Sequence, residues 1–116
     1  MIFDNLQGME IRLATGATDM RKSFNGLAAL VLETFKANPI NGGLYAFSNR
    51  RRNMVKVLYW DRNGFCIWQK RLEKQSFPWP RSEEEAMRIS RDELIWLRGG
   101  IDFRKAHKKL DYGIAV

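Results

Sequence analysis

Hydrophobic and polar positions follow two different spacings in the first third of this chain. Residues 9–13 (MEIRL) alternate with a period of two, which predicts a short strand with one buried face. After a predicted turn at 14–18, apolar positions recur at steps of three and four from 19 to 37, which predicts an amphipathic helix facing a core. Thr18 is the expected N-cap of this helix, and the negative Asp19 suits its first turn.

The middle of the chain has the pattern of an antiparallel β-meander. Three blocks rich in aromatic and β-branched residues predict strands at 44–48, 54–60 and 65–72. The connection at 49–53 is short, and the connection at 61–64 (DRNG) contains the Asn-Gly pair of a tight hairpin. Because short connections favour antiparallel neighbours, we expect the meander to cover one side of the predicted helix.

The last third breaks this regularity. Two prolines interrupt the segment 77–80 (FPWP), and a capping pattern followed by two glycines predicts a short helix at 90–100. The basic tail, 101–116, is compatible with a helix or an extended arm. The predicted fold is therefore α+β: an antiparallel β-meander packed on one long amphipathic helix, with a short C-terminal helix and a basic tail. We expect a single domain over 1–116, with its core at about 9–100.

Composition supports one globular domain with an anionic partner. The 116 residues are 45% hydrophobic and 28% charged, and no apolar run reaches the length that crosses a membrane. The N-terminal residues lack the pattern of a secretory signal, and the single Cys66 rules out an internal disulfide, so we expect a cytoplasmic protein. Twenty Lys and Arg against thirteen Asp and Glu give a net charge of +7, which favours nucleic acid or another polyanion.

Catalytic chemistry is hard to assemble from these residues. The only histidine, His107, lies in the lysine-rich tail, where it is poorly suited to act as a general base. One His and one Cys leave no zinc site, and no glycine-rich phosphate loop indicates a nucleotide cofactor. Asp19 and Asp61 are the candidates for a magnesium-dependent nuclease, although helix capping and turn chemistry also account for them. We therefore expect no catalytic residue, metal or cofactor.

Basic side chains are the stronger signal for binding. The run Arg50–Arg52 falls on a predicted loop, where guanidinium groups suit bidentate phosphate contacts, with a solvated basic loop as the alternative. Arg21 and Lys22 fall in the first turn of the predicted helix, where positive charge opposes the helix dipole. Either a bound phosphate compensates them, or Arg21 pairs with an acid such as Asp19 or Glu10. The predicted nucleic-acid contacts are Arg21, Lys22, Arg50, Arg51, Arg52, Lys70 and Arg71.

The segment 77–80 predicts a different kind of contact. Its aromatic residues, Phe77 and Trp79, are held between prolines and are not expected to be buried by their own segment. Rigid exposed aromatics are typical anchors of protein–protein interfaces. We therefore predict Phe77 and Trp79 as partner-binding residues.

Several blocks in series resemble one protein family. They are 14–31 (ATGATDMRKSFNGLAALV), 56–66 (KVLYWDRNGFC), 70–72 (KRL) and 77–80 (FPWP). In order and spacing they resemble the TnpB accessory proteins of bacterial insertion sequences of the "sixty-six" type, which are unrelated to the RNA-guided nuclease of the same name. The resemblance extends from about Ile11 to Gly100. It implies a non-enzymatic role in transposition, beside a separate transposase that carries the catalytic acids.

Three hypotheses about function follow: two concern the binding partner, and the third is the magnesium-dependent nuclease. The leading hypothesis is binding to DNA of the insertion element, mainly through phosphates. The alternative is an adaptor for the transposase or another element-encoded protein, with Trp79 as its main anchor. The sequence does not indicate an oligomeric state.

Overall fold

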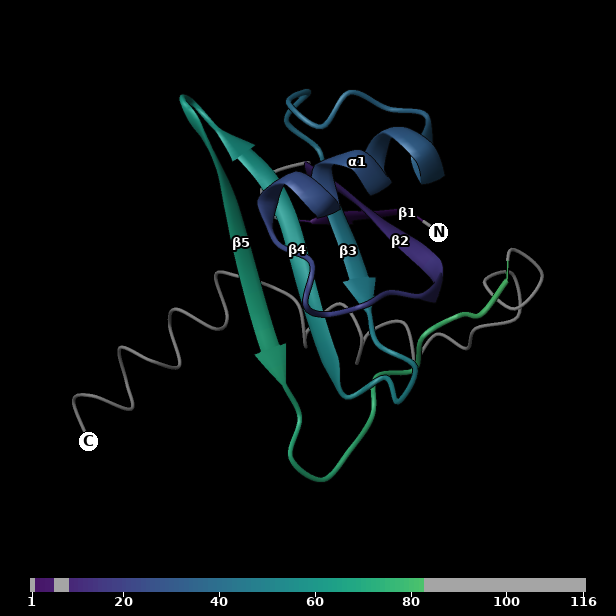
Figure 1. The fold of residues 1–116 in the computed structure, drawn as a ribbon. Helices are drawn as coiled ribbons and strands as arrows, with labels where there is room; N and C mark the ends of the chain where they lie inside the picture. The colour runs from purple at the N-terminus through teal and green to yellow at the C-terminus, as the bar shows by residue number, and fades with distance from the viewer. Residues whose placement is uncertain (1, 6–8, 83–116) are drawn as a thin grey trace.

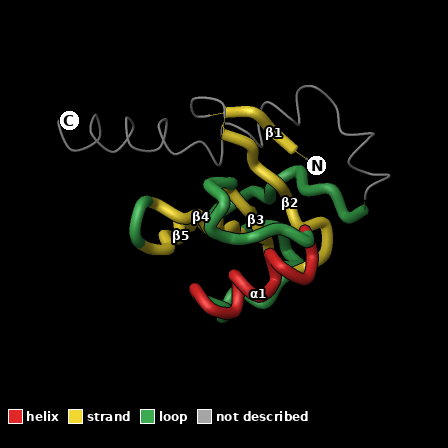
Figure 2. The backbone as a smooth tube through the Cα atoms, turned by 90° about the horizontal axis from the view of Figure 1, so that it is seen from above, coloured by secondary structure: helices red, strands yellow, loops and turns green. Residues whose placement is uncertain are grey.

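A computed structural model describes residues 2–5 and 9–82 of the protein as one sheet with a helix on one face (Figures 1 and 2). The five strands lie in chain order across the sheet. The elements are β1 (Ile2–Asn5), β2 (Met9–Ala17), α1 (Phe24–Phe35), β3 (Leu44–Ser48), β4 (Met54–Asp61) and β5 (Gly64–Arg71). The predicted α+β class is confirmed.

Strands β3, β4 and β5 form the predicted antiparallel meander. Their ends lie within one residue of the ranges that the sequence predicts. The sheet as a whole is mixed, because β1 pairs antiparallel with β2 whereas β2 pairs parallel with β3. Parallel neighbours need a long crossover, and α1 with its flanking loops supplies it.

The connection from β2 to α1 differs from its prediction. Strand β2 continues to Ala17 through a register irregularity after Leu13, so the predicted turn at 14–18 is wrong. The Thr18 amide donates a hydrogen bond to the Ser48 carbonyl oxygen at 2.8 Å, which holds this residue beside β3. Pairing with β3 therefore extends the strand where the local sequence favours a turn.

Helix α1 is shorter than predicted, with 12 residues from Phe24 to Phe35. Its N-cap is Ser23 rather than Thr18, and the Ser23 side chain makes no capping hydrogen bond. The chain from 18 to 23 forms a loop instead of the first helical turn. Leu27 and Val31 are the buried residues of the helix, as expected for the face that packs on the sheet.

The sheet carries apolar residues on both faces. One cluster lies between α1 and the sheet and includes Leu27, Val31, Tyr45, Phe47 and Leu58. The cluster on the other face includes Ile11, Leu13, Leu44, Ala46, Val55, Val57, Phe77 and Trp79. The segment after β5 therefore folds back as a second cover for the sheet.

Several predictions fall outside the part of the chain that the structure describes. The short helix at 90–100 and the basic tail at 101–116 are among them, as is His107. Within the described ranges, α1 is too short to cross a membrane, and no other helix there is long and apolar enough to do so.

Candidate functional site

One end of the sheet gathers most of the basic residues that the sequence singles out. The strand registers align Ala17, Ser48, Val55 and Lys70 in one row across four strands. With strands about 4.8 Å apart, this row spans roughly 14 Å. The loops 18–23 and 49–53 leave the sheet beyond this row, so both basic loops lie at the same end.

The loop from Asn49 to Asn53 is held by hydrogen bonds among its own residues. The Asn49 Nδ2 donates to Asn53 Oδ1 at 2.7 Å, and the Asn49 Oδ1 accepts from the amides of Asn53 and Met54 at 3.2 Å. The Leu72 amide donates to the Asn53 carbonyl oxygen at 2.7 Å, which joins the loop to the chain after β5. The loop is therefore a defined platform.

Arg50 and Arg51 extend from this platform into solvent. Neither forms an ion pair with any residue in the ranges 2–5 and 9–82. These two arginines agree with the sequence-based expectation of an exposed basic loop.

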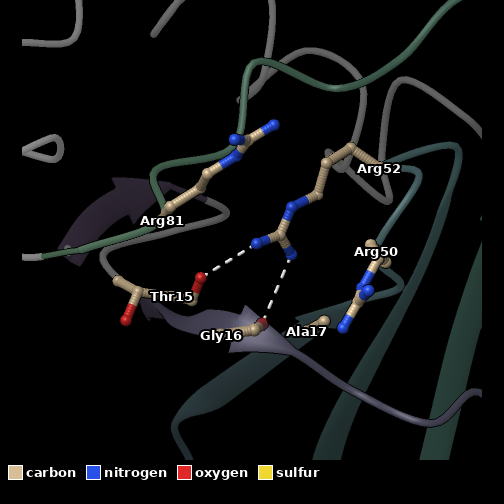
Figure 3. A pocket seen from close by; sticks show the side chains of 6 residues that line it. All are labelled: Thr15, Gly16, Ala17, Arg50, Arg52 and Arg81. Carbon is tan, nitrogen blue, oxygen red and sulfur yellow. Dashed lines mark hydrogen bonds between the residues drawn. The ribbon is translucent and has the colours of Figure 1, made fainter.

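Arg52 behaves differently, and its expected exposure on the loop is wrong. Only 8% of Arg52 is exposed, and its guanidinium donates to the carbonyl oxygens of Thr15 at 2.9 Å and Gly16 at 3.3 Å (Figure 3). Its guanidinium carbon also lies 5.8 Å from the centre of the Trp79 ring, a cation–π distance. Arg52 therefore joins the loop to β2, and we assign it a structural role.

The segment 77–80 is hydrogen-bonded to both β2 and the loop 49–53. The Trp79 Nε1 donates to the Ala14 carbonyl oxygen at 2.7 Å, and the Phe77 amide donates to the Arg52 carbonyl oxygen at 2.6 Å. Phe77 and Trp79 are only 3% and 6% exposed. The expectation that these aromatics stand exposed is wrong, because the open face of the sheet buries them.

Arg21 forms an ion pair with Asp19, which was one of the two alternatives that the sequence left open. Its Nη2 lies 2.6 Å from the Asp19 Oδ2, and its Nε is 3.0 Å from both carboxylate oxygens. The hydrogen bond from Arg21 holds the pKa of the Asp19 carboxyl well below its usual range, and the carboxylate raises the pKa of Arg21. Because α1 begins at Phe24, neither Arg21 nor Lys22 lies in a helical turn, so the predicted conflict with the helix dipole does not arise.

Lys22, Lys70 and Arg71 complete the predicted set. Lys22 is exposed, and its carbonyl oxygen accepts a hydrogen bond from the Lys56 Nζ at 3.0 Å. Lys70 is half-buried near the end of β5. Arg71 follows it and forms an exposed ion pair of 3.2 Å with Glu73. These cations lie at the same end of the sheet as the basic loop, Lys22 on the loop before α1 and the other two at the end of β5.

A hollow of about 440 Å³ opens where β2 ends (Figure 3). Its lining residues are Thr15, Gly16, Ala17, Arg50, Arg52 and Arg81. Arg81 was missing from the sequence prediction. Its one local signal is its position directly after the FPWP segment, and only the folding back of that segment brings it beside β2.

Asp19 and Asp61, the two candidate carboxylates, do not form a shared site. Asp61 pairs with Gly64 at the hairpin end of β4, whereas Asp19 lies next to Thr18 at the opposite end of the sheet. Within the described ranges, no group of three or more His, Cys, Asp and Glu is placed to hold a metal ion. Burial and the neighbouring Cys66 raise the pKa of Tyr59. The separation of Asp19 and Asp61 contradicts the nuclease alternative that paired them.

Comparison with known proteins gives the chain its family. It is 42% identical to the uncharacterized protein y4hO of Sinorhizobium fredii over 98 residues, which cover 84% of this chain and 85% of that protein. It is 32% identical to a second uncharacterized protein of that organism, y4jC, over 103 residues, which cover 89% and 88% of the two chains. No solved structure matches the chain significantly.

The profile of the IS66 Orf2-like family matches residues 9–108. This range includes every block on which the resemblance to the insertion-sequence accessory proteins depends. It also includes both basic loops and the hollow at the end of β2. The chain therefore belongs to the IS66 Orf2-like family, the transposition-associated accessory proteins of this type of insertion sequence.

Proposed function

We propose that the protein binds duplex DNA of its insertion element through phosphate contacts at the basic end of the sheet. The residues assigned to this surface are Lys22, Arg50, Arg51, Lys70 and Arg71. The observation that carries the proposal is the row from Ala17 to Lys70, which sets two basic loops and the end of β5 side by side. We call this surface the basic end.

The geometry suits a nucleic-acid backbone. Phosphate contacts need cations held in a fixed arrangement, and the hydrogen-bonded loop from Asn49 to Asn53 provides one for Arg50 and Arg51. The row spans roughly 14 Å, close to the ~12 Å width of the major groove. Phosphate contacts carry no sequence information by themselves, so we expect binding with little sequence preference.

Two predicted contacts are left out of the basic end. Arg21 is engaged with Asp19, and Arg52 is buried against Thr15, Gly16 and Trp79. Using either as a phosphate ligand would break interactions that the fold already makes. Both are assigned to the structure that supports the neighbouring cations.

The adaptor hypothesis loses its main support. It relied on Phe77 and Trp79 as exposed anchors for the transposase, and both belong to a core cluster. DNA binding is therefore the preferred function, in a protein that acts beside the transposase rather than in its place. Capture of the transposase that is lost in Trp79→Ala, with the fold intact and DNA binding unchanged, would restore the adaptor.

The salt dependence of DNA binding tests the proposal. For the wild type, log affinity falls linearly with log salt concentration, with a slope of about −0.9 for each phosphate neutralised. The double variant Arg50→Gln/Arg51→Gln reduces the magnitude of this slope by about 2, because two phosphate contacts are lost. Fluorescence anisotropy with a labelled duplex from the element's end measures both quantities.

Arg62→Asn is the matched control. Arg62 is an exposed arginine at the opposite end of β4, and its positive φ of 54° is one that asparagine tolerates. The control removes one positive charge, against two in the double variant, and leaves the basic end intact. If it weakens binding as much per charge as Arg50→Gln/Arg51→Gln, or if affinity is flat in salt, the proposed surface is wrong.

A further inference from the structure

Lys56 is a charged residue on the face of β4 that α1 covers. It alternates with Leu58 along the strand, and Leu58 belongs to the cluster between α1 and the sheet, so the Lys56 side chain faces the same way. Its register partners are Phe47 and Gln69, and neither is an acid. A half-buried ammonium group needs a hydrogen-bond acceptor, because burial disfavours a charge without a partner.

The acceptor for Lys56 is the backbone of the loop before α1. The Lys56 Nζ donates a hydrogen bond to the Lys22 carbonyl oxygen at 3.0 Å, where this loop crosses the sheet on the α1 side (Figure 1). The Lys22 amide donates to the Asp19 carbonyl oxygen at 3.1 Å, which closes a turn within the loop. The backbone of Lys22 is therefore held on both sides, by β4 and by its own loop.

Gly26 accommodates the side chain of the same lysine. A Cβ built at Gly26 would lie 3.2 Å from the Lys22 Cβ and 3.3 Å from its Cγ, so the Lys22 stem lies directly over this glycine. Gly26 lies in the first turn of α1, and glycine is a weaker helix former than alanine. The close approach of the Lys22 stem gives a physical reason for a glycine at this position.

We infer that Lys56 and Gly26 are positioning residues that hold Lys22 in place for its contact with a DNA phosphate. The inference rests on the proposed function, in which Lys22 is one of the phosphate contacts. Lys22 is exposed, and within the described ranges it forms no ion pair. Asp19, the acid of the same loop, already accepts hydrogen bonds from Arg21 on both carboxylate oxygens. A lysine that is held in place loses less conformational freedom on binding than a mobile one does.

A double-mutant cycle distinguishes a positioning role of Lys56 from a direct contact with DNA. Lys56→Met keeps the apolar stem and removes the donor to the Lys22 carbonyl oxygen. We expect Lys22→Gln to weaken duplex binding about fivefold and to reduce the salt slope by about 1, because one phosphate contact is lost. Lys56→Met weakens binding nearly as much by itself. In the Lys22→Gln background it has no further effect, because the side chain that it positions is absent.

Gly26→Ala tests the same inference with the opposite effect on stability. Alanine favours the helix more than glycine does, and the exposed Lys22 stem can move aside, so we expect a higher melting temperature. The added Cβ displaces the stem by a few tenths of an ångström, and we expect about threefold weaker binding. Weaker binding by a more stable protein cannot come from unfolding. This variant keeps the test valid if Lys56→Met fails to fold.

Lys36→Asn is the matched control. Lys36 is an exposed lysine at the other end of α1, and its positive φ of 53° is one that asparagine tolerates. It removes one positive charge without touching the loop before the helix. We expect its affinity for the duplex to stay within about 1.5-fold of the wild type.

The outcomes separate this inference from the proposed function. A double variant about 25-fold weaker than the wild type, with the salt slope reduced by about 2, would mean that Lys56 contacts phosphate itself and would overturn the inference. Unchanged affinity in Lys56→Met and Gly26→Ala would also overturn it.

A readout without DNA comes from NMR order parameters of the Lys22 and Ser23 amides in the free protein. We expect them to fall in Lys56→Met, because the loop loses its attachment to β4. Unchanged values refute the anchoring by Lys56 whether or not DNA binds. A wild type without salt-dependent binding refutes the proposed function instead, and the order parameters still decide the anchoring.

Discussion

Strand β4 is entered and left through turns that each contain an arginine with left-handed backbone geometry. Arg52 precedes the strand with φ at 58°, and Arg62 follows it with φ at 54°. In both residues the side chain is strained against the backbone, because left-handed φ values are sterically unfavourable for L-amino acids. Only Arg52 uses its side chain to offset that cost, through carbonyl oxygens of β2 and the Trp79 ring.

A basic turn residue can therefore serve the fold or face the solvent with the same left-handed φ. Arg62 is exposed in a two-residue turn that the pairing of β4 and β5 already defines. Arg52 lies where the loop 49–53, the end of β2 and the segment 77–80 meet. Its guanidinium joins these three segments, which no strand pairing connects. Its hydrogen bonds also attach the loop that carries Arg50 and Arg51 to β2, which connects the fold to the basic end.

The largest expected effect is a loss of stability in Arg52→Ala. The variant leaves the part-buried carbonyl oxygens of Thr15 and Gly16 without this donor and removes the contact with Trp79, which together cost about 3 kcal/mol in the free energy of unfolding. Arg62→Ala costs less than about 0.5 kcal/mol, because its side chain is exposed. Urea denaturation of both variants measures the difference, and equal losses would contradict the structural role of Arg52.

A smaller loss is expected for Trp79→Phe. This change keeps most of the aromatic surface but removes the indole donor at 2.7 Å from the buried Ala14 carbonyl oxygen. An unsatisfied buried acceptor costs about 1.5 kcal/mol. Thermal or urea unfolding measures the loss, with Trp60→Phe as a control for replacing a half-buried indole. A loss no larger than that of the control would mean that the hydrogen bond contributes nothing.

Glycine at the two turn positions is expected to act with opposite signs. Arg62→Gly relieves the left-handed strain and raises stability by about 0.5 kcal/mol after its greater unfolded-state entropy is counted. Arg52→Gly relieves the same strain but loses the buried side-chain contacts, so it destabilises. The same sign in both variants, measured by urea unfolding, would show that backbone strain rather than side-chain contacts separates the two turns.

The smallest effect concerns the exposed pair of Asp19 and Arg21. Arg21→Gln raises the pKa of the Asp19 carboxyl toward its ordinary value, because the hydrogen-bonded cation is removed. A carboxyl with a lowered folded-state pKa stabilises the fold above its unfolded pKa, and that contribution disappears as the pH falls. The variant therefore loses less stability in acid than the wild type does. Carboxyl NMR titration measures the shift, and an unchanged pKa would contradict the pairing.

Much of the fold follows from local patterns. The strands of the meander and the existence of α1 are visible in residue spacing, because each depends on contacts between neighbours in sequence. The hairpin connection at 61–64 is confirmed, but the positive φ falls on Arg62 rather than on the Asn-Gly pair that the sequence indicates. The end of β2 and the start of α1 were missed because pairing with Ser48 overrides the local turn preference.

The candidate site also has a part that the sequence predicts and a part that only the fold decides. The sequence identified the run Arg50–Arg52 as basic, but it could not distinguish two solvent-facing arginines from one buried neighbour. Arg81 and the hollow had no local signal strong enough to predict them. The aromatic pair of the FPWP segment was expected outside, and it lies in the core because the sheet offers it an apolar face.

Residue spacing and composition alone determined that this is a basic α+β protein with a meander, the helix α1 and the blocks of its family. Tertiary structure decided which cations face the solvent and which are enclosed. The physical reason is the distance along the chain: Arg52 finds its acceptors 36 and 37 residues away, and Trp79 finds its acceptor 65 residues away. Contacts of that separation form only when the sheet is complete, so the role of each arginine is a property of the folded chain.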